Sequence, residues 1–347
     1  MKANRPHIMI IGGGITGLSA AYYAKKKLAA EGIDARLTIV EKSPSFGGKI
    51  HTIERDGFVI EKGPDSVLAR KRPTIDLAKE LGLENELTGL NPEAKKTYIV
   101  RKGKMHRMPQ GLVLGIPTQI TPFMKTGLIS PMGKVRAAMD LLLPKREASS
   151  DESLGRFLQR RLGKEVLDNV VEPLLAGIYA GDTFHLSLKA TFPQFQAMEQ
   201  KYKSLILGMM ASRKNATTEN AHVPDRLKSS AFVTFKKGLQ TVVDALVEHL
   251  SGEDLRTGVG AVSILKTAEG RTEVVLDNGD REIVDGVVIT TPTYQAAECL
   301  GRLPVAADLG KIEYISVANV IMGFHKRTFH LHWMHPGSSY RATKEER

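Results

Sequence analysis

The 347-residue sequence contains a single cysteine, Cys299, and a single tryptophan. One cysteine excludes an intramolecular disulfide and a structural zinc site built from several cysteines. Because Cys299 lies among apolar residues, we expect a buried, unreactive thiol, which fits a reducing, cytoplasmic compartment. Nowhere do 18 apolar residues run together, so no membrane-spanning helix is predicted. The apolar stretch 8–24 is crowded with glycine, which is not typical of a signal peptide.

Acidic residues are scarce in one segment of the chain. The whole sequence carries 49 Lys and Arg against 38 Asp and Glu, a formal charge of +11. Residues 95–147 hold eleven of the basic residues and only Asp140 and Glu147 as acids, a net of +9. Such an excess fits nucleic acid, an anionic membrane surface, or an acidic substrate or cofactor. Aromatic residues are only 6% and no nucleic-acid-binding motif is present, so we expect no nucleic-acid partner.

The overall composition is that of a globular protein. Hydrophobic residues make up 42% and charged residues 25%, and the length fits about two domains. No repeat of about 20–50 residues is present. The segment 150–153 is typical of a helix start, and the polar stretch 215–225 predicts a loop.

The amino-terminal residues predict a strand, a glycine-rich turn, a helix and a second strand, in that order. Residues 7–11 form a short apolar run typical of a buried parallel strand, and residues 36–41 form another. Between them, Gly12, Gly14 and Gly17 have the Gly-x-Gly-x-x-Gly spacing. The first glycine permits a tight turn, the second lets the backbone approach a pyrophosphate, and the third lets helix and strand pack closely. The helix start then offers free N–H groups to phosphate.

Glu41 ends the second predicted strand, 24 residues after Gly17. A carboxylate at this position accepts hydrogen bonds from ribose hydroxyls and would repel a 2′-phosphate. The pattern therefore predicts NAD or FAD as the bound nucleotide.

The residues after Glu41 separate these two cofactors. Gly47-Gly48-Lys49 supplies a second glycine pair at which bare backbone can approach a ligand, and Gly63-Pro64-Asp65-Ser66 supplies a further turn. NAD-binding folds do not require this extension. The combination resembles the flavoprotein superfamily that contains amine oxidases, phytoene desaturases and protoporphyrinogen oxidases.

Three later stretches, residues 174–182, 235–240 and 287–292, resemble the porphyrinogen oxidases more than the amine oxidases. Over about residues 6–324 the chain is similar to the FAD-dependent protoporphyrinogen/coproporphyrinogen oxidase family, of the soluble type of Gram-positive bacteria. The resemblance implies an α/β fold of the amine-oxidase-like type. It has a Rossmann-like FAD-binding domain, an α+β substrate domain and an inserted helical domain, here C-terminally incomplete.

The resemblance also implies where the domains lie. The expected ranges are 1–75 and 231–295 for the discontinuous FAD-binding domain, 76–110, 190–230 and 296–324 for an incomplete substrate domain, 111–189 for a helical domain that faces the membrane in some members, and 325–347 for a tail unlike the family. Because family members continue much further, we expect the strand ending at Phe324 to lack sheet partners. The tail histidines His330, His332 and His335 have no convincing metal-ligand spacing, so no metal is expected.

Carried over by position, the resemblance implies a set of FAD-contacting residues. They are Gly12, Gly13, Gly14, Ile15, Thr16, Gly17, Glu41, Lys42, Gly47, Gly48, Lys49, Gly63, Pro64, Asp65, Ser66 and Val262. Val262 would meet the adenine through its backbone. Interpreted without the family, Val262 is an ordinary strand residue.

The implied reaction is the six-electron oxidation of coproporphyrinogen III, and also of protoporphyrinogen IX, in haem biosynthesis, with O2 as oxidant and hydrogen peroxide as product. Because the flavin carries this chemistry, no catalytic side chain is expected. Arg70 and Lys71 are the candidate partners of the substrate propionates, Lys71 first, although both also fit exposed basic residues before a helix starting near Thr74. The alternatives are a flavin amine oxidase or carotenoid desaturase, or an inactive FAD-binding fragment.

The basic segment interleaves apolar pieces with Lys125, Lys134 and Arg136. This pattern fits peripheral contact of a cytoplasmic protein with an anionic membrane. It also fits a solvated face over an ordinary core. The oligomeric state is left open.

Overall fold

The computed structural model describes most of the chain. The described residues are 5–89, 97–109, 111–113, 115–147, 150–179, 181–219, 221–228, 230–301 and 303–322. The expected tail 325–347, with its histidines, lies outside them. The chain forms two compact units, one of residues 1–90 and 222–321 and the other of residues 91–221 and 322–347. The finer division into three domains stays a prediction.

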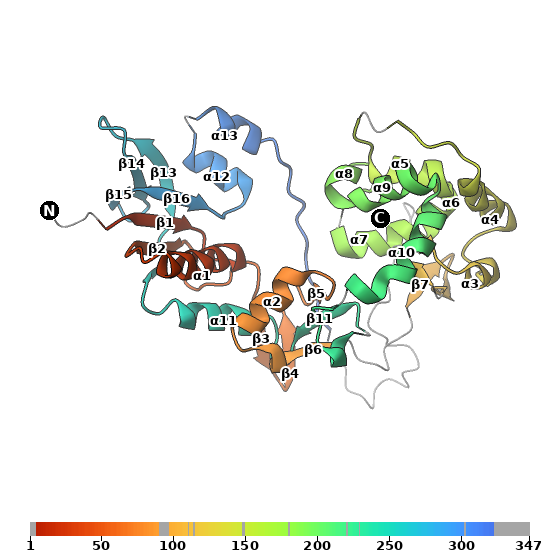
Figure 1. Ribbon diagram of the computed structural model, residues 1–347, viewed down its shortest axis with the longest axis horizontal. Coiled ribbons are helices and arrows are strands. Elements are labelled where there is room, and N and C mark those ends of the chain that lie inside the picture. Colours follow the sequence, from red (N-terminus) through yellow and green to blue (C-terminus); the bar gives the residue numbers. More distant parts are fainter. Residues whose placement is uncertain are drawn as a thin grey trace. The chain divides into compact units, whose positions relative to one another are not determined.

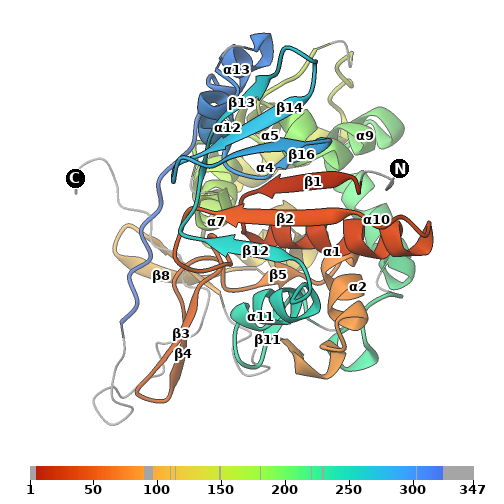
Figure 2. The ribbon, with the colours of Figure 1, turned by 90° about the vertical axis from the view of Figure 1, so that its left-hand side faces the viewer.

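A four-stranded parallel sheet lies at the centre of the first unit, with its strands side by side in Figure 2. In spatial order the strands are β12 (Asp254–Thr257), β2 (Arg36–Glu41), β1 (His7–Ile11) and β16 (Gly286–Ile289). In the central strand β1, Ile10 lies opposite Ile39 on one side and Val288 on the other. The predicted strands 7–11 and 36–41 are confirmed. The sheet is discontinuous in sequence, because its two outer strands come from beyond residue 250.

Strands β1 and β2 are apolar on both faces because both faces of the sheet are covered (Figure 1). Ile10 and Ile39 share a core with Leu18 of the helical layer. Met9 and Ile11 belong to a second core that lies against an antiparallel sheet. The covering elements are α1 (Ile15–Ala30), α11 (Gln240–His249) and the strands β13 (Ala261–Lys266), β14 (Thr272–Leu276) and β15 (Arg281–Val284).

Smaller elements complete the first unit. They are the hairpin β3 (Thr52–Arg55) and β4 (Phe58–Glu61), the antiparallel sheet of β5 (Val67–Leu68), β11 (Phe232–Phe235) and β6 (Leu87–Gly89), and the helices α2 (Arg72–Glu80), η1 (Glu84–Glu86), η4 (Asp225–Leu227), α12 (Thr293–Cys299) and α13 (Pro304–Leu309). Helix α2 begins two residues before the expected Thr74, because Pro73 occupies its first turn, where proline is favoured. Within the described residues, 312–322 pair with no strand and are exposed.

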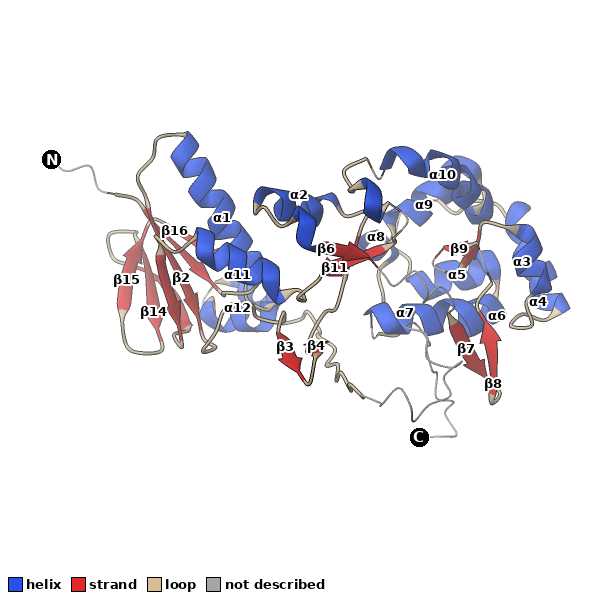
Figure 3. Cartoon of the chain, turned by 90° about the horizontal axis from the view of Figure 1, so that it is seen from below, coloured by secondary structure: helices blue, strands red, loops and turns tan. Residues whose placement is uncertain are grey.

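The second unit is mainly helical (Figure 3). Its elements are β7 (Tyr98–Arg101), β8 (Lys104–Arg107), β9 (Leu112–Val113), β10 (Ile116–Pro117), α3 (Ile120–Lys125), α4 (Pro131–Ala138), η2 (Met139–Leu141), α5 (Leu154–Leu162), α6 (Lys164–Val166), η3 (Leu167–Val171), α7 (Glu172–Tyr179), α8 (Leu188–Thr191), α9 (Pro193–Tyr202) and α10 (Leu205–Glu219). The predicted helix start at 150–153 is confirmed, since the Ser153 hydroxyl caps α5 by accepting from the N–H of Arg156.

The predicted loop 215–225 is wrong in its first part, because α10 continues to Glu219 and no glycine or proline after Gly208 interrupts it. Among the helices that the structure describes, none combines the length and apolarity needed to cross a bilayer.

Asp254 anchors the edge of the parallel sheet in a network of charges. Its carboxylate lies 2.7 Å from Arg256 Nη2 and 2.8 Å from Arg36 Nη2. It also accepts from the Thr38 hydroxyl at 3.1 Å. The hydrogen bond from Arg256, with that from Arg36, lowers the pKa of Asp254 far below its ordinary value.

A carboxyl whose pKa is lowered by folding stabilises the protein above its unfolded-state pKa of about 3.9. This contribution is lost as the pH falls from there through the lower folded-state pKa. We therefore expect Asp254→Asn to lower the free energy of unfolding at pH 7 and to lower it less near pH 2, where part of the contribution has been lost. Denaturant titrations of both proteins at the two pH values measure this difference. An equal loss at both would show that the carboxylate charge is not the cause.

Candidate functional site

The glycine-rich turn joins β1 to α1 and is held by close backbone contact. Gly12 has a positive φ of 106°, and a Cβ on Gly17 would lie 1.9 Å from the Gly12 carbonyl oxygen. The Thr290 hydroxyl, at the end of β16, donates to the same carbonyl at 3.0 Å. Helix and strand therefore approach as closely as the Gly-x-Gly-x-x-Gly spacing predicts. Thr290 was not singled out from the sequence, because it is 278 residues away from its partner.

The start of α1 presents bare backbone. Gly14 is the N-cap, and no side chain caps the helix. The first N–H groups of a helix have no partner inside it, so those of Ile15 and Thr16 are available to an anion. A Cβ on Gly14 would meet nothing closer than the Gly48 Cα, at 3.8 Å. This surface is open to an approaching ligand.

The second glycine pair lies against the first turn. Gly14 and Gly47 form an isolated parallel bridge, and the N–H of Gly47 donates to the Gly13 carbonyl at 2.9 Å. Two glycine-rich segments far apart in sequence thus form one bare-backbone surface at the carboxyl edge of the parallel sheet. In open α/β sheets, ligands bind at this edge.

Glu41 ends β2 beside this surface. Its Oε2 accepts from the Gly13 N–H at 2.7 Å and its Oε1 from the Ser43 N–H at 2.8 Å. Each carboxylate oxygen keeps a further lone pair that can accept from a ribose hydroxyl. The loop between β12 and β13 is tied to the same place, because the N–H of Val259 donates to the Glu41 carbonyl at 3.0 Å. Lys42 directly follows Glu41, and Val262 lies in β13, just after this loop.

Val262 lies in β13 and is 53% exposed. Its backbone role toward adenine stays a prediction.

The segment with Gly63, Pro64, Asp65 and Ser66 runs beside the second glycine pair. The N–H of Lys62 donates to the His51 carbonyl at 2.9 Å, and Asp65 accepts from the Ser66 hydroxyl at 2.8 Å. Asn319, from the extended stretch 312–322, donates to the Gly63 carbonyl at 3.0 Å.

Tyr314 in the same stretch lies near Lys49. The Lys49 ammonium is 5.6 Å from the centre of the Tyr314 ring, and the Thr293 N–H donates to the Tyr314 hydroxyl at 3.1 Å. Hydrogen bonding from Thr293 lowers the pKa of Tyr314. Tyr314 and Asn319 were not anticipated as site residues. Their only sequence signal is that they stand in the last stretch that resembles the family.

The described surface fits a dinucleotide. It combines bare backbone, free N–H groups at a helix start, and a carboxylate fixed at the end of the neighbouring strand. A model for flavin containing amine oxidoreductases matches residues 15–345. The chain belongs to this flavoprotein family. The resemblance drawn from the sequence is confirmed, and so is the amine-oxidase-like α/β fold.

Three relatives in the family illustrate the match. Coproporphyrinogen III oxidase of Bacillus subtilis is 44% identical over 93% of this chain and 68% of the relative, and that of Staphylococcus aureus is 38% identical over 92% and 68%. A crystal structure of a protein assigned as a protoporphyrinogen oxidase from Exiguobacterium has a TM-score of 0.75 and 35% identity. That alignment covers 89% of this chain and 64% of that structure. The chain therefore spans about two thirds of the length of these relatives.

Two other candidates from the sequence lie on the surface. Arg70 and Lys71 directly precede α2 and are exposed, and neither has an ion-pair partner within the described ranges. Their exposure fits both the substrate-binding and the solvent-exposed interpretation.

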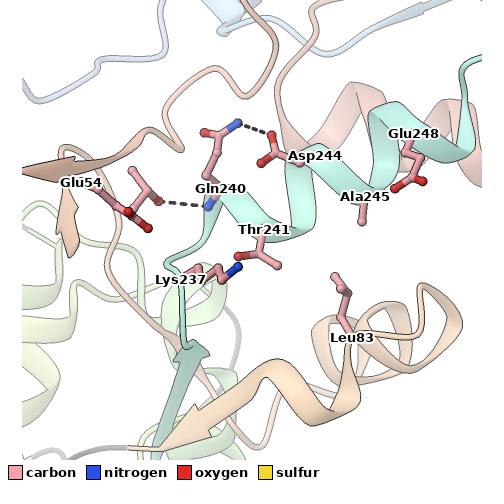
Figure 4. A pocket seen from close by; sticks show the side chains of 9 residues that line it. Glu54, Leu83, Lys237, Gln240, Thr241, Asp244, Ala245 and Glu248 are labelled. Carbon is pink, nitrogen blue, oxygen red and sulfur yellow. Dashed lines mark hydrogen bonds between the residues drawn. The ribbon is translucent and has the colours of Figure 1, made fainter. Parts of the chain in front are cut away.

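A pocket of about 420 Å³ in the first unit lies between β3, Leu83 and α11 (Figure 4). Gln240 lines it, donating from its side chain to Asp244 at 3.0 Å and from its N–H to the Thr52 hydroxyl at 3.0 Å. No residue of the expected nucleotide site lines this pocket. It is therefore separate from the expected nucleotide site.

Cys299 is buried, its thiol donates to the Ala261 carbonyl at 3.2 Å, and burial raises its pKa. The predicted burial of this thiol is confirmed. In the part of the chain that the structure describes, no three His, Cys, Asp or Glu side chains are grouped to hold a metal ion.

Proposed function

We propose that this chain is a porphyrinogen oxidase that uses FAD and O2 to oxidise coproporphyrinogen III, and also protoporphyrinogen IX, in haem biosynthesis. The observation that carries the proposal is the 44% identity to a coproporphyrinogen III oxidase along 93% of this chain. Bound FAD would supply the two-electron chemistry, so that the loss of six electrons and six protons by the porphyrinogen is balanced by reduction of three O2 to three H2O2.

In this proposal the residues of the chain bind and orient the reactants. The N–H groups of Ile15 and Thr16 hold the pyrophosphate, and Glu41 accepts from the ribose hydroxyls. Lys49 stays beside the cofactor because it is held over the Tyr314 ring.

The direct test adds coproporphyrinogen III to the purified chain and follows porphyrin fluorescence together with hydrogen peroxide. We expect about three peroxides per porphyrin, from the electron balance above. Peroxide formed from an amine, without porphyrin, would favour an amine oxidase. Desaturated carotenoid products would favour a desaturase.

Lys71 is the proposed partner of a substrate propionate. We expect Lys71→Glu to raise KM for coproporphyrinogen III about tenfold, because a charge-assisted hydrogen bond is replaced by repulsion. FAD binding should not change. Lys27→Glu makes the same charge change on an exposed residue of α1 and should leave KM unaltered. Equal KM values for the two variants would remove Lys71 from the site.

We also propose that the second unit contacts an anionic membrane surface through an apolar strip on α3, α4 and residues 139–142. The strip consists of Ile120, Met124, Met132, Val135, Met139, Leu141 and Leu142, all exposed, with Leu142 85% exposed. Lys134 joins the two helices by donating to the Met124 carbonyl at 2.7 Å. An exposed apolar strip flanked by cations is typical of peripheral membrane contact.

The cations of this surface are fewer than the sequence suggests. Arg136 donates to the Arg160 carbonyl at 2.8 Å, at the end of α5, and Lys134 donates to the Met124 carbonyl. Of the three basic residues expected there, only Lys125 has no hydrogen-bond or ion-pair partner among the described residues.

Leu142→Ser tests the membrane contact. We expect binding to vesicles of phosphatidylcholine and phosphatidylglycerol to weaken about tenfold or more, because an apolar side chain no longer leaves water. Ile33→Ser removes an exposed apolar side chain from the first unit and is the control. Co-sedimentation measures both. Equal binding by both variants and the unaltered chain would contradict the contact.

A further inference from the structure

A second pocket, of about 610 Å³, lies in the second unit between the end of β8 and helix α3. Both elements are visible in Figure 3. Its polar lining comes from His106 and Arg107 on the strand side and from Gln119, Thr121, Lys125 and Thr126 on the helix side. None of the residues that line it is Asp or Glu. The pocket therefore offers hydrogen-bond donors and positive charge without a carboxylate to neutralise them.

Several cations of this segment have no partner among the described residues, and two of them, Arg107 and Lys125, line this pocket. Arg101 is held by the Leu128 carbonyl at 2.8 Å and lies 3.7 Å from Glu165. By contrast, Arg107 and Lys125 have no ion-pair or hydrogen-bond partner in the described part of the chain. Two unpaired cations facing one pocket favour an anion that accepts several hydrogen bonds, such as a phosphate or a carboxylate.

Helix α3 places apolar surface directly beside these cations. Thr121 and Lys125, four residues apart, both line the pocket. Ile120 and Met124, also four residues apart, lie on the adjacent face and are 64% and 53% exposed. Residues four apart share one face of a helix. The anion site is therefore bordered by a strip that can contact acyl chains, which free phosphate does not have.

We propose that this pocket binds the phosphate of an anionic phospholipid, with Arg107 and Lys125 as its cationic partners and Ile120 and Met124 against the acyl chains. The inference rests on the membrane contact proposed above and assigns it a specific headgroup site. The shape of the site, rather than surface charge alone, then determines which lipids bind.

The test measures binding of dihexanoyl phosphatidylglycerol below its micelle concentration to the full chain by calorimetry. We expect binding by the unaltered protein and a loss of about tenfold or more in Arg107→Glu, because two units of charge change at the phosphate. Lys104→Glu makes the same change three residues earlier on β8, outside the pocket lining, and should bind nearly as well as the unaltered chain. Circular dichroism checks that both variants are folded.

The outcomes separate the two proposals. Vesicle binding without binding of the monomeric lipid would overturn the headgroup site and leave the membrane contact standing. Monomeric lipid binding that depends on Arg107, with no vesicle binding, would support the site and overturn the contact. Inorganic phosphate that binds as tightly as the lipid would overturn the assignment to phospholipid. Equal losses in Arg107→Glu and Lys104→Glu would reduce the effect to overall charge and overturn the site.

Discussion

Gly14→Ala is expected to give a folded protein that binds FAD about 100-fold more weakly, a loss of about 2.8 kcal/mol. The new methyl group has room in the protein, since its nearest neighbour would be 3.8 Å away. The backbone at Gly14 is extended, with φ −73° and ψ 177°, which alanine adopts without strain. The methyl group would instead occupy the space through which a pyrophosphate approaches the helix start. FAD titration measures the loss, and thermal unfolding without FAD checks the fold.

Gly17→Ala is the matched control, because it makes the same chemical change three residues later. Here the methyl carbon would lie 1.9 Å from the Gly12 carbonyl oxygen and 2.8 Å from the Thr290 hydroxyl. The helix must move away from the strand, and such overpacking costs about 1–3 kcal/mol or more. We therefore expect Gly17→Ala to lose stability and FAD together, whereas Gly14→Ala loses FAD alone. Normal FAD affinity in Gly14→Ala would contradict the location of the pyrophosphate.

Arg161→Met is expected to destabilise the second unit by about 3–5 kcal/mol, because it leaves the buried Asp140 carboxylate without a cationic partner. Arg161 and Asp140 are both fully buried, and Arg161 Nε lies 2.5 Å from Asp140 Oδ1. The other Asp140 oxygen accepts from the Ser204 hydroxyl at 2.6 Å. Arg161 also donates to the Lys203 carbonyl at 2.7 Å. One side chain thus joins η2, α5 and the junction of α9 with α10.

Arg156→Ala provides the comparison for that variant. Arg156 lies on the same helix α5, is exposed, and has no side-chain partner within the described residues. Its replacement should change the free energy of unfolding by less than about 0.5 kcal/mol. Denaturant unfolding followed by circular dichroism measures both variants. If Arg161→Met were as stable as Arg156→Ala, the buried charge cluster would not hold the helices together.

The nucleotide-binding part of the fold could be predicted because its signals are local. An apolar run before Gly12, a glycine spacing that ends at Gly17, and an acid at Glu41 each follow from residues close in sequence. The order of strand, turn, helix and strand then restricts the topology to a parallel unit. The structure reproduces these elements residue for residue at both strands.

Features made by contacts between distant residues could not be predicted in this way. Nothing near Thr290 in the sequence shows that its hydroxyl closes the turn at Gly12. Likewise, nothing near Tyr314 in the sequence shows that the Lys49 ammonium lies over its ring. Counting charges also overestimates the free positive charge of the basic segment. Arg136 donates to a carbonyl at the end of α5, so its guanidinium is not free to contact a membrane. In each case the partner is set by packing, which a linear pattern does not contain.

The oxidase activity proposed for this chain depends on FAD binding at the turn between β1 and α1. Equilibrium titration of the purified, flavin-free chain with FAD, followed by flavin fluorescence, measures that binding. We predict saturable binding of one FAD per chain, with the bound flavin oxidising coproporphyrinogen III on addition. A chain that is folded by circular dichroism but takes up no FAD at any concentration would show that this turn is not a FAD site.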